Sequence, residues 1–287
     1  MRPGGYRAEP EPVKLAGRPR AGLIVAVAFT VLVAACSSSR SPDAKTRDKN
    51  PDTSSTAAPR SSSAPVADWS IVALGDSVPA GAACGCAPFP ELSAADLSVP
   101  GVRSVTATDD AVSGSTTADV LHQVTADHRV INALRRADAA EIEIGANDIQ
   151  YTKKCGTDVA CYTPSVPPME RNLDAIVLRV RQLLTGGPDI VVLLDYWSVW
   201  LGGQYAREKG PAYVRAAESV TDSVDKAIRA VAAQTGSAYV DLRLAFRGPT
   251  YSYDETRYLA ADGDHPNTAG HQRIAAAVVT AIKSRMR

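Results

Sequence analysis

The sequence of 287 residues has no excess of charge of either sign, because 31 lysine and arginine residues balance 31 aspartate and glutamate residues. This balance gives no support for a nucleic-acid-binding protein, which usually carries a basic excess. Cysteine is also scarce, with five residues, so the chain is not a disulfide-dense miniprotein. A hydrophobic content of 45% is close to that of an average globular protein and excludes a wholly disordered chain.

The N-terminal hydrophobic run, residues 21–35, is too short for a membrane-spanning helix. At about 1.5 Å per residue, a helix of this length covers about 22 Å, whereas the hydrocarbon core of a bilayer is about 30 Å thick. Basic residues precede the run, and it ends in Val33-Ala34-Ala35-Cys36, a small-residue cleavage site directly before a cysteine. This order of features predicts a signal peptide over residues 1–35.

The end of this run resembles the lipobox of bacterial lipoproteins, in which the cysteine is lipidated and becomes the new N-terminus. The resemblance implies that Cys36 carries lipid. An uncleaved anchor with an incidental cysteine is the alternative. We therefore expect an exported protein, anchored through lipid to the outer face of the bacterial cell membrane or released to the cell envelope.

Residues 36–67 are rich in serine, proline, alanine and charge, and they contain almost nothing to bury. Such a segment does not offset its ordering entropy, so it predicts a disordered tether after Cys36. The formal charge is +3 over residues 1–35, +2 over residues 36–67 and −5 over residues 68–287. The zero net charge is thus the sum of a basic leader and an acidic domain.

From residue 68 onward, short apolar runs alternate with longer segments of helical periodicity, and we see no internal repeat. This alternation predicts an α/β domain, a three-layer α/β/α sandwich with a central parallel sheet. The expected strands cover residues 70–74, 104–108, 140–144, 190–195 and 238–241. The expected helices cover residues 91–96, 117–125, 170–184, 212–235 and 268–285.

Polar motifs follow the expected strands. They are GDSV at 75–78, DDAVSGSTT at 109–117, GAND at 145–148 and, before the last helix, DGDHP at 262–266. Each motif alone could be an ordinary turn. Ligands of open α/β sheets bind beyond the carboxyl ends of the strands, so we expect these motifs to form one site.

In this order the four motifs resemble those of the SGNH hydrolases, also called the GDSL esterase/lipase family. The family is named for a serine, a glycine, an asparagine and a histidine, and the matching positions here are Ser77, Gly114, Asn147 and His265. The resemblance implies that residues 68–287 form an SGNH hydrolase domain with a flavodoxin-like sheet. It also implies an ester hydrolase that needs no metal and no organic cofactor.

A serine hydroxyl becomes a good nucleophile only when a base takes its proton. We expect Ser77 to be the nucleophile and His265 the base, with Asp262 folding back to orient the imidazole, although Asp264 competes for that role. The resemblance implies an oxyanion hole made by the backbone N–H groups of Ser77 and Gly114 and the side-chain amide of Asn147. The expected partner is an ester substrate, either an acyl lipid or an acetylated glycan, and we expect a monomer.

Two other functions remain open on the same fold. One is an acyl or acetyl transferase or a carbohydrate deacetylase. The other is a non-catalytic lipoprotein that binds glycans or lipids. The Gly-x-Ser-x-Gly elbow of the α/β-hydrolases is absent around Ser77, where the text is GDSVP, so that serine-hydrolase fold is excluded.

The four cysteines beyond Cys36 can oxidise in an exported protein. Cys155 and Cys161 flank a short loop, and we expect them to pair. Cys84 and Cys86 flank a single glycine, across which a bridge is feasible. Cross-pairing of the two loops and a four-cysteine zinc site are the alternatives.

The segment after the fourth expected strand, residues 195–205, is rich in aromatic side chains. Since it follows a strand, it should lie on the same edge of the sheet as Ser77. Trp197 and Trp200 could therefore line the rim of the substrate site, or they could cap the hydrophobic core.

Overall fold

A computed structural model describes residues 67–286 of the chain. The predicted signal peptide, the Cys36 lipidation site and nearly all of the predicted tether lie outside the described residues, so these assignments stay predictions. Within the described part, no helix combines the length and the apolar character that crossing a membrane requires.

Five parallel strands form the central sheet, in the order β2-β1-β3-β4-β5. This is the predicted flavodoxin-like arrangement, in which the chain reverses its direction of winding beside β1. The strands are β1 Ala67–Gly75, β2 Arg103–Asp109, β3 Ala139–Glu143, β4 Ile190–Leu194 and β5 Ala238–Val240.

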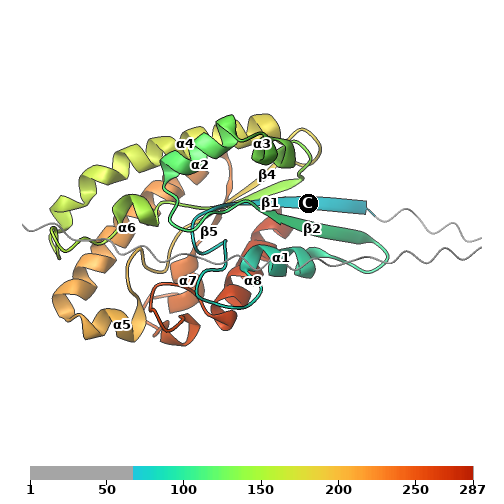
Figure 1. The fold of residues 1–287 in the computed structure, drawn as a ribbon. Helices are drawn as coiled ribbons and strands as arrows, with labels where there is room; N and C mark the ends of the chain where they lie inside the picture. Colours follow the sequence, from blue (N-terminus) through green and yellow to red (C-terminus); the bar gives the residue numbers. More distant parts are fainter. Residues whose placement is uncertain (1–66, 287) are drawn as a thin grey trace, which may run out of the picture. The chain divides into compact units, whose positions relative to one another are not determined.

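Helices cover both faces of the sheet, which confirms the three-layer prediction (Figure 1). On one face the strands share a hydrophobic core with α2 Thr117–Ala126, α3 His128–Leu134, α4 Val166–Leu183 and α6 Pro211–Thr235. On the other face they share a core with α1 Phe89–Leu97, α7 Leu242–Arg247 and α8 Thr268–Arg285. The short helix α5 Gly203–Glu208 lies before α6.

The five expected strands and the five expected long helices are all present, and each boundary lies within a few residues of its prediction. The sequence analysis missed α3, α5 and α7, each of six or seven residues. Two turns of helix are too short to show a clear helical period. Asp127 explains the break before α3, because its carboxylate accepts the N–H groups of Arg129 and Val130 and so starts a new helix one residue after α2 ends.

The central strand β3 carries two glutamates whose side chains are completely buried. The hydroxyl of Ser93 on α1 donates a 2.7 Å hydrogen bond to Glu141, whereas neither carboxyl oxygen of Glu143 has a partner within the described residues. Burial raises the pKa of Glu141 to about 8, and it raises the pKa of Glu143 well above its ordinary 4.5. The carboxyl group of Glu141 is therefore mostly protonated at neutral pH.

Candidate active site

Three of the four predicted motifs meet at the carboxyl ends of β1 and β3. Ser77 lies in the turn after β1, Asn147 in a short 3-10 helix, Ala146–Ile149, after β3, and His265 in the loop before α8. All three residues line one cavity of about 50 Å³. Gly114, in the turn between β2 and α2, and Asp262 are not among the residues that line this cavity.

Asp262 lies behind the imidazole of His265. Its Oδ2 is 2.7 Å from Nδ1 of the histidine, and its Oδ1 accepts the backbone N–H groups of Asp264 and His265 at 3.0 and 3.1 Å. Burial alone would raise the pKa of Asp262, but these hydrogen bonds outweigh it and lower the pKa. A carboxylate at Nδ1 places the ring proton there and leaves the lone pair of Nε2 free to accept a proton.

Asp264, the competing residue, faces elsewhere. Its side chain lines the cavity itself, and no hydrogen bond joins it to the imidazole in the described part of the chain. Of the two aspartates considered for orienting the imidazole, Asp262 is the one hydrogen-bonded to it.

The serine hydroxyl makes no hydrogen bond to His265 or to any other described residue, although both side chains face the same cavity. Catalytic hydrogen bonds are often long or poorly aligned before substrate binds. The lack of one here is therefore compatible with Ser77 and His265 acting as nucleophile and base.

A buried network that the sequence analysis missed holds the turn of Ser77. Asp76 accepts the N–H of Val78 at 3.2 Å and the hydroxyl of Tyr196 at 2.8 Å. The same tyrosine oxygen accepts the N–H of Ala146 at 3.3 Å. Tyr196 thus ties the serine turn after β1 to the asparagine motif after β3, across 120 residues of sequence.

The protonation states in this network suit those roles. Burial raises the pKa of Asp76, to about 6, so the group is mostly an acceptor at neutral pH. Burial also raises the pKa of Tyr196 well above its ordinary 10, so the hydroxyl keeps the proton that it donates. The only sequence signal for this link was the position of Tyr196 directly after a strand.

Gly75 lets the serine turn approach β3 closely. Its φ is +149°, and a Cβ placed there would come within 2.0 Å of the carbonyl oxygen of Glu143. The N–H of Asp76 donates to that same oxygen at 3.2 Å. Only glycine therefore fits between β1 and β3 at the point where the chain turns toward Ser77.

Three N–H donors near the serine lack acceptors. Neither the backbone N–H of Ser77 nor that of Gly114 finds a hydrogen-bond acceptor within residues 67–286. Asn147 donates one amide hydrogen to the carbonyl of Ser115 at 3.0 Å, which fixes the side chain and leaves its second N–H without a partner among those residues. Gly114 has a φ of +85°, a backbone conformation that favours glycine.

Trp197 and Trp200 are both buried, as the core interpretation expected. Their exposed fractions are 1% and 3%. The indole of Trp197 stacks on Phe246 with ring centroids 4.5 Å apart, and the indole N–H of Trp200 donates to the carbonyl of Ile149 at 2.8 Å. Trp197 also lines the serine cavity, and Trp200 lines a neighbouring cavity, so both contribute to the walls of the site.

A second cavity, of about 490 Å³, adjoins the serine cavity. The two share Gln150, Val199 and Asp264 in their walls. The aromatic rings of Tyr151 and Tyr213 form part of the larger one. Room for a substrate much larger than an acetyl group therefore lies directly beside Ser77.

Both expected disulfides are present in the structure, Cys84–Cys86 in the segment after Ser77 and Cys155–Cys161 in the loop after the asparagine motif. The sulfurs are thus joined within each loop and not across the two loops. Thr157, between the second pair, lines the larger cavity.

The chain matches the family model described as GDSL-like Lipase/Acylhydrolase over residues 73–273. A search of curated proteins found no match.

Among solved structures, the fold is similar to the lipase Lip_vut3 from a goat rumen metagenome, with a TM-score of 0.55 and 19% identity over 74% of this chain and 97% of that one. It is also similar to a lipase/acylhydrolase from Enterococcus faecalis, with a TM-score of 0.53 and 22% identity over 76% and 96% of the two chains. A third similar structure is the acetylxylan esterase Axe2 from Geobacillus stearothermophilus, with a TM-score of 0.53 and 20% identity over 76% and 95%.

Proposed function

The chain belongs to the GDSL-like lipase/acylhydrolase family, and on that premise we propose that it is a serine esterase that hydrolyses carboxylic esters through Ser77, His265 and Asp262. The observation that carries the proposal is the pairing of a serine and a histidine in one cavity with a carboxylate hydrogen-bonded behind the histidine.

In this mechanism Nε2 of His265 takes the proton of the Ser77 hydroxyl while Oγ attacks the ester carbonyl carbon. The tetrahedral intermediate collapses when the imidazolium gives that proton to the departing alcohol oxygen. Water, activated by the same imidazole, then hydrolyses the acyl-enzyme. Asp262 stabilises the imidazolium through Nδ1 and keeps the ring in one orientation.

The oxyanion of the intermediate would be bound by the N–H of Ser77, the N–H of Gly114 and the free amide hydrogen of Asn147. All three donors lack acceptors among the described residues, which supports this role. Loss of one such donor typically costs about 3 kcal/mol of transition-state stabilisation. The link from Asn147 to the Ser115 carbonyl would hold the amide in place before substrate binds.

For the substrate we propose an acyl lipid or an acetylated glycan. The similar structures include lipases and an acetylxylan esterase, and the larger cavity has room for an acyl chain or a sugar next to Ser77. We further propose that the enzyme is exported and held at the outer face of the cell membrane by lipid on Cys36.

The test is a chain-length series of p-nitrophenyl esters beside acetylated sugars, measured on the wild type, on Ser77→Ala and on Ser219→Ala. Ser219 is an exposed serine on α6 and serves as the matched control. We expect Ser77→Ala to lose fluorophosphonate labelling and at least 10³-fold in turnover, and Ser219→Ala to keep both. Full activity in Ser77→Ala would refute the proposal. Transfer of the acyl group to added alcohols in preference to water would instead identify a transferase.

A further inference from the structure

The Cys84–Cys86 disulfide lies against the start of helix α8. The pair belongs to the segment between Ser77 and α1, and both cysteines are partly exposed. Sγ of Cys84 is 3.9 Å from the hydroxyl oxygen of Thr268, the first residue of α8. The N-terminus of an 18-residue helix favours negative charge on a nearby sulfur.

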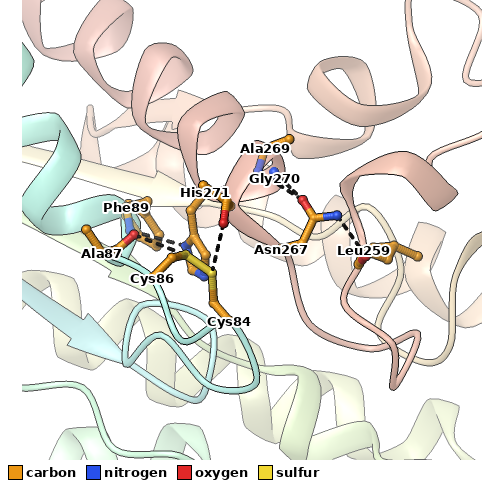
Figure 2. Close-up of a disulfide and its surroundings, with 10 residues drawn as sticks. Cys84, Cys86, Ala87, Phe89, Leu259, Asn267, Ala269, Gly270 and His271 are labelled. Carbon is orange, nitrogen blue, oxygen red and sulfur yellow. Dashed lines mark hydrogen bonds between the residues drawn. A yellow bond between two sulfur atoms is a disulfide. The ribbon is translucent and has the colours of Figure 1, made fainter.

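A buried histidine faces the same sulfurs. His271, one turn into α8, is completely buried, and its Nδ1 accepts the backbone N–H of Phe89 at 3.2 Å. One of its ring nitrogens and the two sulfurs all lie within 4.8 Å of one another, and Figure 2 shows the ring beside the disulfide.

The tautomer of His271 follows from its contacts. Burial lowers the pKa of His271 to about 4, so the ring is neutral at pH 7. A neutral imidazole that accepts at Nδ1 carries its proton at Nε2. That Nε2 has no partner among the described residues, so an unused N–H donor is buried where a thiolate would be its natural acceptor.

We propose that Cys84–Cys86 is an exchange-active disulfide that reacts with low-molecular-mass thiols and releases Cys84 as the stabilised thiolate. The helix N-terminus, the Thr268 hydroxyl and the His271 N–H all favour negative charge at this position. Stabilisation of the reduced form makes a disulfide more oxidising and its leaving group faster. This activity is independent of the ester hydrolysis at Ser77.

A thiolate R–S⁻ attacks Sγ of Cys86, the R–S–S–Cys86 bond forms, and the old S–S bond breaks with its electron pair on Cys84. A second R–S⁻ attacks the R sulfur, which releases R–S–S–R and leaves Cys86 as a thiolate that takes up a proton. Two thiols are oxidised and one protein disulfide is reduced. Cys86 is the poorer leaving group, because its sulfur lies 3.5 Å from the carbonyl oxygen of Ala87.

The second disulfide provides an internal control in the same molecule. In the described part of the chain, no side-chain donor contacts Sγ of Cys155 or Cys161, and no histidine groups with them. The two pairs also differ in loop size, with two residues of sequence separation against six, so the contribution of the surroundings is read from the substitutions described below.

The experiment equilibrates the whole protein at pH 7 with glutathione buffers of graded thiol-to-disulfide ratio, traps free thiols by alkylation and quantifies each cysteine by mass spectrometry. We expect Cys84–Cys86 to be half-reduced at a glutathione thiol-to-disulfide ratio at least tenfold lower than the ratio at which Cys155–Cys161 is half-reduced. At partial reduction, the glutathione adduct should be on Cys86 and the free thiol on Cys84.

Two variants test the cause. Thr268→Val, at the exposed first position of α8, and His271→Phe, which removes the buried N–H, should each move the Cys84–Cys86 midpoint several-fold toward that of Cys155–Cys161. If His271→Phe does not fold, the midpoint of Thr268→Val and the cysteine that carries the glutathione adduct still test the proposal. Equal midpoints for the two wild-type disulfides, or an adduct on Cys84, would overturn the proposal.

Discussion

Replacing Glu141 by glutamine should remove the loss of stability that the buried carboxyl group causes as the pH rises from about 4.5 to about 8. Glu141 is completely buried in β3, where Ser93 donates to one carboxyl oxygen and the other oxygen has no partner within residues 67–286. Burial raises its pKa from the ordinary 4.5 to about 8. Glutamine keeps the shape of the protonated acid and the acceptor for Ser93, but it does not ionise.

The raised pKa of Glu141 determines how the free energy of unfolding changes with pH. Between about pH 4.5 and pH 8 the folded state still holds the proton of Glu141 while the unfolded chain has lost it. Unfolding is therefore favoured progressively as the pH rises through this window, and the effect is constant above it. At about 1.4 kcal/mol per pH unit, the full cost of Glu141 is on the order of 5 kcal/mol.

The assay is urea unfolding followed by tryptophan fluorescence at pH 5, 7 and 8.5. We expect Glu141→Gln to differ from the wild type by about 1 kcal/mol or less at pH 5, and to be more stable by several kcal/mol at pH 8.5. The control is Glu208→Gln, which removes the same charge from an exposed position on α5. A difference between Glu141→Gln and the wild type that stays the same at all three pH values would refute the reasoning.

Three further substitutions test the site and its support. Tyr196→Phe removes the hydroxyl that joins the serine and asparagine turns, so kcat for a p-nitrophenyl ester should fall about tenfold with KM nearly unchanged. The same change should lower the free energy of unfolding by about 1–3 kcal/mol. An unchanged kcat would contradict a positioning role. Trp197→Ala should cost about 3–5 kcal/mol in urea unfolding, because the indole is buried on Phe246; a cost below about 1 kcal/mol would instead indicate an exposed rim residue. Gly75→Ala should yield little soluble protein, because its Cβ would overlap the Glu143 carbonyl; wild-type yield and melting temperature would show that β1 and β3 can separate there.

The strands and long helices could be predicted because their signals are local. The strands β1, β4 and β5 contain apolar runs closed by a glycine or an aspartate, and the long helices α4 and α6 show several turns of helical period. The alternation of strands and helices predicted a parallel sheet covered on both faces, whereas its flavodoxin-like order came from the family resemblance. The short helices α5 and α7 escaped prediction because six residues carry too little periodicity.

The order of motifs likewise identified Ser77, Asn147 and His265 as residues of one site, because the carboxyl ends of parallel strands meet at one edge of the sheet. The spacing favoured Asp262 over Asp264 as the partner of the histidine, but it left Asp264 as a competitor. Both are within three residues of His265, and only the path of the loop decides which carboxylate reaches Nδ1.

By itself, then, the sequence determined the family, the α/β layers and the chemical groups available at the site, because these depend on residue types and their order along the chain. The tertiary structure alone decided which distant groups touch. Tyr196 donates to Asp76 across 120 residues of sequence because β4 and β1 lie in one sheet. His271 accepts from Phe89 across 182 residues because α8 packs against α1. It also decided that Trp197 and Trp200 belong to the core, since burial depends on packing from elements that no local pattern encodes.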